Sequence, residues 1–214
     1  MSATRARLWV RGLYAVTPDI ADTERLLQLT RAALSGGVRV VQYRNKVASL
    51  ATLLAQAREL KNLCAAHGAA LIVNDYVDVA IEADADGIHV GRDDRSCIDA
   101  REAVGADKIV GVSCYDNLEN ARAAERNGAD YVAFGSFFPS RVKPGAVRPT
   151  VDLLTKAKAE LTVPIVAIGG ITAENAGQLG RAGADAVAVI SALFEATDVT
   201  AAARKVIASF ESRS

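Results

Sequence analysis

The sequence has few cysteines, and their spacing pairs none of them. Cys64, Cys97 and Cys114 are far apart, and none belongs to a CxxC motif. An odd number of widely separated cysteines gives neither a disulfide framework nor a structural zinc site. We therefore expect a protein of the reducing cytoplasm.

Net charge and long apolar runs are also missing. Twenty-five basic residues balance twenty-five acidic ones, so no overall field favours nucleic acid or an anionic membrane, and an anion site has to be local. The apolar run near the start is too short for a signal peptide, and no stretch reaches the ~18 apolar residues of a membrane span. We expect an unexported protein with no nucleic-acid or membrane partner. The sequence does not indicate its oligomeric state.

The chain is long enough for one sizeable core. Its 214 residues are 50% hydrophobic, which predicts a single domain over residues 1–214, with residues 1–11 as an N-terminal extension. Eight short apolar runs alternate with segments of helical period, and each run resembles a strand buried on both faces. The runs begin at Leu13, Val38, Ala70, Gly87, Lys108, Tyr131, Pro164 and Ala186.

Eight βα units in a chain of this length predict an α/β fold, a closed (β/α)₈ TIM barrel. An open, doubly wound sheet of eight strands is the alternative. No GxGxxG motif follows the first strand, so the dinucleotide-binding pattern does not support that alternative.

Polar residues gather at the predicted carboxyl ends of the strands, where a barrel carries its chemistry. In the stretch VQYRNK, the alternating residues Gln42, Arg44 and Lys46 share one face of the second strand. The other strand ends and the loops after them carry Asn74, Asp75, His89, Asp94, Ser113, Ser140, Lys143, Gly170 and Ser191. His89 either fills a core layer or orients the neighbouring loop.

These residue types indicate phosphate chemistry. Arg44 offers a bidentate fork, and Lys46 and Lys143 offer point charges that suit a polyanion. Asp75 and Asp94 are hard oxygen ligands suited to Mg²⁺, which takes one or two protein carboxylates and fills its remaining positions with water and phosphate. The glycines of AIGGIT and the turn VIS offer backbone N–H groups to a second anion.

Motifs over nearly the whole chain resemble the thiamine-phosphate synthase family. The stretches VQYRNK, VNDYVD, IHVGRDD, GVSCYD, FFPSRVKPG, AIGGIT and VIS follow one another in the family's order on successive strand ends. The resemblance implies a Mg²⁺-dependent transferase. It would join 4-amino-5-hydroxymethyl-2-methylpyrimidine diphosphate to hydroxyethylthiazole phosphate and release pyrophosphate through a dissociative, carbocation-like step.

The resemblance also implies roles for single residues. Gln42 would hold the pyrimidine ring, and Asn74 would line its site. Arg44, Lys46 and Lys143 would grip the diphosphate, with Ser113 near the reacting carbon, so these four are the catalytic candidates. Asp75 and Asp94 would hold Mg²⁺. The thiazole phosphate would be bound by Ser140 and by the backbone of Gly170, Ile190 and Ser191.

Two other functions remain open at this point. A thiazole tautomerase on the same barrel would bind thiazole phosphate but would not need the combination of Arg44, Lys46, Lys143 and the two aspartates. A non-catalytic phosphate-sensing barrel would keep the glycine-rich cradle but would tolerate loss of the metal pair. We also expect residues 139–149, which lie between two prolines, to form a cover that ligands order.

Overall fold

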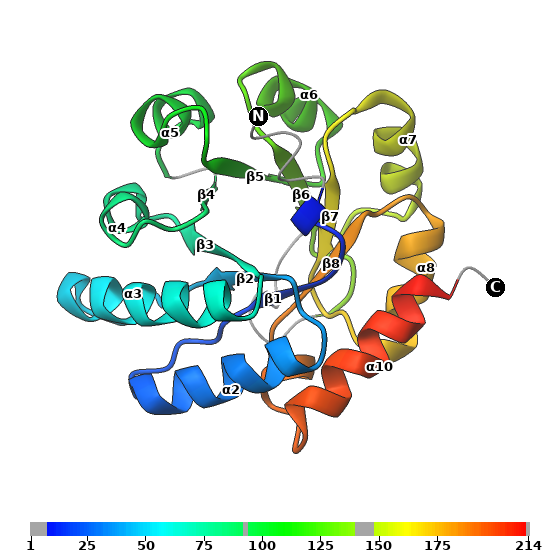
Figure 1. Ribbon diagram of the computed structural model, residues 1–214. Helices are drawn as coiled ribbons and strands as arrows, with labels where there is room; N and C mark the ends of the chain where they lie inside the picture. Colours follow the sequence, from blue (N-terminus) through cyan, green and yellow to red (C-terminus); the bar gives the residue numbers. More distant parts are fainter. Residues whose placement is uncertain (1–7, 92–93, 140–147, 213–214) are drawn as a thin grey trace.

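The chain forms a closed barrel of eight parallel strands, in which each strand pairs with its neighbours in sequence order and β8 pairs with β1 (Figure 1). The structure is a computed structural model that describes residues 8–91, 94–139 and 148–212. The predicted (β/α)₈ fold is confirmed, and the open-sheet alternative is wrong. The strands are β1 Gly12–Val16, β2 Val40–Tyr43, β3 Ala70–Asn74, β4 Gly87–Val90, β5 Ile109–Tyr115, β6 Tyr131–Gly135, β7 Ile165–Ile168 and β8 Ala186–Val189.

Helices surround the barrel and follow the strands around it (Figure 1). They are α2 Thr23–Ser35, α3 Leu50–Ala66, α4 Val77–Glu82, α5 Cys97–Val104, α6 Leu118–Arg126, α7 Asp152–Glu160, α8 Ala173–Arg181, α9 Ser191–Phe194 and α10 Val199–Glu211. Helix α10 packs against both α8 and α2, and so covers the strands where the barrel closes. Within the described ranges, no helix combines the length and the apolar character that crossing a bilayer requires.

The strands are buried on both faces because alternate residues serve two separate cores. In β1, Leu13 and Ala15 belong to the layer between strands and helices, whereas Tyr14 and Val16 point into the barrel. This explains why the strand segments are hydrophobic almost throughout. It also leaves the inward positions available for polar side chains near the carboxyl ends.

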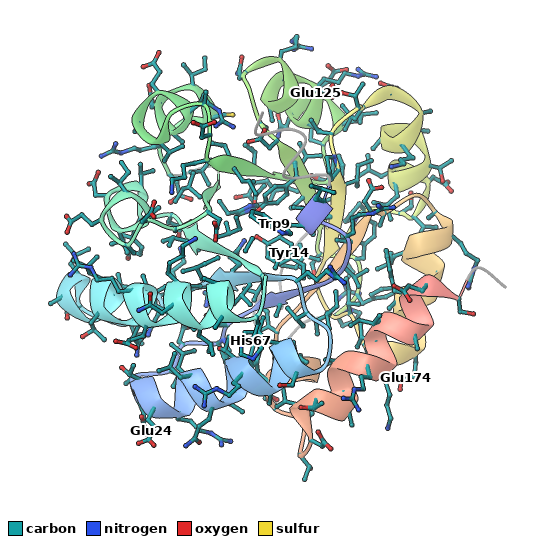
Figure 2. All side chains as sticks on the ribbon, in the orientation of Figure 1. Trp9, Tyr14, Glu24, His67, Glu125 and Glu174 are labelled. Atoms are coloured by element: carbon teal, nitrogen blue, oxygen red, sulfur yellow. The ribbon has the colours of Figure 1, made fainter. Side chains whose placement is uncertain are left out.

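Residues before the first strand close the end of the barrel at which the strands begin. Val10 is fully buried, and it packs with the partly buried Trp9 against the interior cluster that contains Tyr14 and Tyr131. Figure 2 shows Trp9 and Tyr14 near the barrel axis. The barrel is therefore a filled core at this end, and its open space lies at the other end, where the strands finish.

Candidate active site

A cavity of about 450 Å³ opens at the carboxyl ends of the strands. All eight strands contribute to its walls, which makes it a feature of the closed barrel rather than of one loop. Seven of the residues predicted for binding line it, and they are Gln42, Arg44, Asn74, Ser113, Gly170, Ile190 and Ser191. The barrel thus brings together residues that are as much as 149 positions apart in the sequence, as the span from Gln42 to Ser191 shows.

At the end of β2, the predicted alternation holds for Gln42 and Arg44, whereas Lys46 does not line the cavity. Gln42 points into the barrel and Arg44 lines the cavity, while the residues between and after them turn outward. The Tyr43 hydroxyl donates to Gln56 Oε1 on α3 at 2.6 Å, and Asn45 Nδ2 donates to the Ile20 carbonyl at 3.0 Å. These outward contacts anchor the strand end, and they fix which side chains can face the cavity.

The segment after β1 holds the Arg44 side chain in place. Arg44 Nη1 donates to Asp19 Oδ1 at 3.0 Å, and the same oxygen accepts from the Lys46 backbone N–H at 2.8 Å. Thr17 Oγ1 accepts from the Arg44 backbone N–H at 2.9 Å and donates to the Arg44 carbonyl at 3.0 Å. Asp19 and Thr17 therefore pre-position a guanidinium that is only 20% exposed. Neither residue could be assigned from the sequence, because TPD after a strand is also typical of an ordinary turn.

Lys46, Asp75 and Asp94 form a charged rim beside the cavity. The Lys46 ammonium donates to Asp75 Oδ2, and this hydrogen bond is the main cause of the raised pKa of Lys46. Asp94 Oδ2 accepts from the Gly91 backbone N–H at 2.7 Å. Burial, followed by the neighbouring Asp75 carboxyl, raises the pKa of Asp94. The two carboxyls are therefore close enough to interact, and their mutual repulsion favours a cation between them.

The rim suits a metal that needs few protein ligands. Among the residues that the structure describes, no three His, Cys, Asp or Glu side chains gather into a metal-binding cluster. Two neighbouring carboxylates fit Mg²⁺, which completes its octahedron with water and phosphate oxygens. The geometry does not fit a structural zinc site, which needs four protein ligands.

The turn after β7 is a cradle of backbone N–H groups. Gly170 has φ +63°, and a Cβ at this position would lie 2.3 Å from the Pro139 carbonyl oxygen, so only glycine fits. Thr172 caps α8, Asn175 Oδ1 accepts from the Thr172 N–H at 2.9 Å, and Asn175 Nδ2 donates to the Gly170 carbonyl at 3.0 Å. Gly170 and Thr172 both line the cavity, so the positive end of the helix dipole faces it.

The floor of the cavity is a line of hydrogen-bonded side chains that crosses the barrel. Gln42 Nε2 donates to the Tyr14 hydroxyl oxygen at 3.1 Å, and the Tyr14 and Tyr131 hydroxyls are 2.7 Å apart. The Tyr131 hydroxyl lies 2.9 Å from His89 Nδ1, and His89 Nε2 lies 2.9 Å from Ser113 Oγ. We call these five residues the interior chain. The two tyrosines could not be assigned to the site from the sequence, because an aromatic residue in an apolar strand is also typical of ordinary core packing.

Three other predicted features have different outcomes. Ser140 and Lys143 lie outside the described residues, as does most of the predicted cover over residues 139–149. Their roles stay predictions. Cys114, which the sequence leaves unpaired, is fully buried, and burial raises the pKa of its thiol to about 12. The cavity wall also includes Tyr115, Ser136 and Glu195, which the sequence analysis did not single out.

Thiamine-phosphate synthases of several bacteria are similar to this chain in sequence. Residues 13–193 match the sequence model of the family described as thiamine monophosphate synthase. A thiamine-phosphate synthase of Thiobacillus denitrificans is 55% identical over 197 residues, which cover 92% of this chain and 93% of that protein. One from Chromobacterium violaceum is 53% identical, with 95% of this chain and 98% of that protein covered.

Solved structures agree in fold. Thiamine phosphate pyrophosphorylase from Pyrococcus furiosus superposes with a TM-score of 0.84 at 34% identity, and the match covers 97% of this chain and 98% of that one. A 3-hexulose-6-phosphate synthase has a TM-score of 0.72 at 21% identity, covering 92% of this chain and 99% of that one, and shows the barrel fold alone. Because the family model spans most of the chain and the curated relatives share over half of their aligned residues with it, this chain belongs to the thiamine monophosphate synthase family.

Proposed function

We propose that this enzyme makes thiamine phosphate by transferring the pyrimidinylmethyl group of 4-amino-5-hydroxymethyl-2-methylpyrimidine diphosphate to hydroxyethylthiazole phosphate. The observation that carries the proposal is one cavity in which an amide, a guanidinium and a backbone anion cradle converge, with a lysine and two aspartates at its rim. Such a site suits two anionic substrates, one of which carries a leaving diphosphate.

Each part of the cavity has a task in this reaction. The Gln42 amide faces the edge of the aminopyrimidine ring, and Asn74 lines the same site. Arg44 and Lys46 bind the diphosphate as charge grows on it. Lys143, predicted from the sequence, would bind the same group. Ser113 lies near the reacting carbon. Gly170, Ile190 and Ser191 offer their backbone to the thiazole phosphate, together with Ser140.

The bond changes require little acid–base chemistry. The bond between the pyrimidinylmethyl carbon and the diphosphate oxygen breaks, and its electron pair leaves with the diphosphate. The lone pair of the thiazole nitrogen then forms the new C–N bond. What such a reaction demands is stabilisation of growing negative charge by pre-positioned cations in a site with little water. The anchoring of Arg44 by Asp19 supplies that pre-organisation.

Asp75 and Asp94 fit Mg²⁺, and we propose that they hold it. When bound, the ion would neutralise charge on the diphosphate and help to orient it. Lys46 contacts Asp75 across the rim, so the lysine is in position to bind the same diphosphate. We also place the enzyme in the cytoplasm, where its three unpaired thiols would stay reduced.

The proposal is tested by product analysis with purified protein and Mg²⁺. With both substrates present, thiamine phosphate and pyrophosphate should form in equal amounts, and omission of either substrate should abolish both products. Conversion of a thiazole phosphate isomer without the pyrimidine substrate would indicate a tautomerase instead. Binding of thiazole phosphate without any turnover would indicate a phosphate sensor.

A further inference from the structure

The interior chain has a direction, which follows from counting its hydrogens. A glutamine Nε2 can only donate, so the Tyr14 oxygen accepts from Gln42. The Tyr14 hydrogen must then go to its other neighbour, the Tyr131 oxygen, 2.7 Å away. The Tyr131 hydrogen in turn points to His89 Nδ1, at 2.9 Å. With Nε2 of Gln42 facing Tyr14, this is the order that gives both tyrosine hydroxyl hydrogens an acceptor.

The direction determines which nitrogen of His89 carries the proton. Because Nδ1 accepts from Tyr131, the neutral imidazole carries its hydrogen on Nε2, which faces Ser113 Oγ at 2.9 Å. Ser113 Oγ therefore accepts from His89, and its own hydrogen is left to point into the cavity that Ser113 lines.

We propose that His89 is a positioning residue, which the interior chain holds as the Nε2–H tautomer so that the Ser113 hydroxyl is presented to the substrate as a donor. This inference rests on the proposed function and assigns a task to residues behind the substrate contacts. A donor at Ser113 would strengthen its hydrogen bond as negative charge grows on the departing diphosphate oxygen. At the other end, Gln42 lines the cavity that would take the aminopyrimidine ring.

Burial keeps the direction of the hydrogen bonds in the interior chain fixed. Gln42 and His89 are each 6% exposed, Tyr14 is 1% exposed, and Tyr131 is fully buried. Burial raises the pKa of both phenols well above their ordinary value, so each keeps its proton at all physiological pH values. The reversed order would require the Gln42 amide to turn so that Oε1 replaces Nε2 at the Tyr14 hydroxyl, so the orientation of this buried amide sets the direction of the interior chain.

Nitrogen NMR tests the tautomer in the free enzyme. The chain has only two histidines, His67 and His89, so a long-range ¹H–¹⁵N spectrum of histidine-labelled protein contains two ring systems. His67 is an internal control, because its Nδ1 faces the Leu63 carbonyl at 3.0 Å and must donate to it. For the neutral rings, we expect Nδ1–H at His67 and Nε2–H at His89. An Nδ1–H tautomer at His89 would overturn the proposal.

Two matched variants test the link to catalysis. Tyr131→Phe removes the hydroxyl that faces His89 Nδ1, so the His89 tautomers should mix and the single-turnover rate should fall about three- to tenfold, the value of one neutral hydrogen bond. Tyr14→Phe leaves Tyr131 free to donate to His89. It should preserve the tautomer and mainly raise KM for the pyrimidine substrate, because Gln42 loses its acceptor. Both changes remove one buried oxygen, so a purely structural role predicts the same response from both.

The outcomes separate this inference from the proposed function. Identical tautomers and identical kinetics in the two variants would overturn the positioning role even if the wild-type enzyme makes thiamine phosphate. Absence of turnover in the wild-type enzyme would contradict the function, whereas the tautomer of His89 would still be decided by the spectrum. If Tyr131→Phe fails to fold, the wild-type spectrum alone decides, since the Nδ1–H form excludes the proposed order.

Discussion

Gln42 and Arg44 lie two residues apart on one strand end, yet the structure gives them different surroundings. Both line the cavity, but Gln42 is buried and bonded to Tyr14, whereas Arg44 is held by Asp19. Binding that strengthens in the transition state raises the rate of the chemical step, and uniform binding mainly sets KM. The two residues should therefore differ in the kinetic constant that they affect.

In the Arg44→Gln variant, the single-turnover rate should fall about 10²-fold or more, by comparison with removal of one oxyanion-hole donor. Gln42→Ala should suffer chiefly in KM for the pyrimidine substrate. Arg44→Lys should recover only part of the rate, because a point charge does not reproduce the planar fork that Asp19 orients. Single-turnover and steady-state kinetics at saturating thiazole phosphate measure both effects. An unchanged single-turnover rate in Arg44→Gln would make Arg44 a docking residue only.

The cysteines should differ in their reactivity in the folded protein. Burial raises the pKa of Cys64 and of Cys114 to about 12, so at pH 8 a thiolate fraction of only ~10⁻⁴ is available at either position. Cys97 is half-buried, with a pKa that burial also raises. A colorimetric thiol titration should thus reach only Cys97 in the native protein and all three thiols in denaturant. Rapid modification of three thiols without denaturant would contradict this burial.

Single residues could be assigned to the site from the sequence where their pattern is rare in an ordinary core strand. The alternation of Gln42 and Arg44 on a strand end is one such pattern, and both residues reached the cavity wall. Tyr14 and Tyr131 could not be assigned in this way, because 117 residues separate two hydroxyls that lie 2.7 Å apart. Asp19 was missed for a related reason, since its partners follow the next strand.

At the scale of elements, β5 shows how a strand shapes the site. The sequence predicted this strand to end near Ser113, but β5 continues to Tyr115, and its pairing register with β6 shifts between these two residues. Tyr115 has φ +57°, an uncommon conformation for a bulky residue. The irregularity turns the strand end toward the cavity, which both Ser113 and Tyr115 line. Such a register shift depends on the neighbouring strand, so it cannot be predicted from the sequence of β5 alone.

Gly111 at the middle of β5 should resist substitution because Tyr131 occupies the space beside it. A Cβ on Gly111 would lie 2.0 Å from Tyr131 Cζ. We expect Gly111→Ala to lower the free energy of unfolding by roughly 1–3 kcal/mol, the usual cost of overpacking a core. Urea denaturation measures the change.

A second substitution serves as the control for Gly111→Ala. In a Tyr131→Leu background the added methyl no longer meets the ring, so the double variant should be more stable than the sum of the two single losses implies. Strict additivity of the two losses would show that contact with Tyr131 is not the cause.

At the scale of the whole molecule, the sequence supports the fold strongly because a buried parallel barrel repeats one unit eight times. The prediction needed only the hydrophobic runs and the helical segments between them, and the family resemblance drawn from the ordered motifs was confirmed. Barrel closure determines which strand ends meet at the site. It joins β8 to β1 and thereby places the Gly170 turn and the Arg44 strand end on one cavity.

The central claim is that cations at this mouth stabilise the departing diphosphate, and its most direct test is the rate of thiamine phosphate formation as Mg²⁺ is varied. Asp75→Asn and Asp94→Asn are the informative variants, because asparagine tolerates the positive φ of Asp75 and removes only the charge. Asp78→Asn, an exposed position on α4, is the matched control.

The wild-type and Asp78→Asn rates should rise with Mg²⁺ and vanish in excess chelator. The rates of the two rim variants should fall about a hundredfold or more, while their thermal unfolding stays cooperative. A full rate in excess chelator, or wild-type rates in both folded rim variants, would contradict the role proposed for these cations.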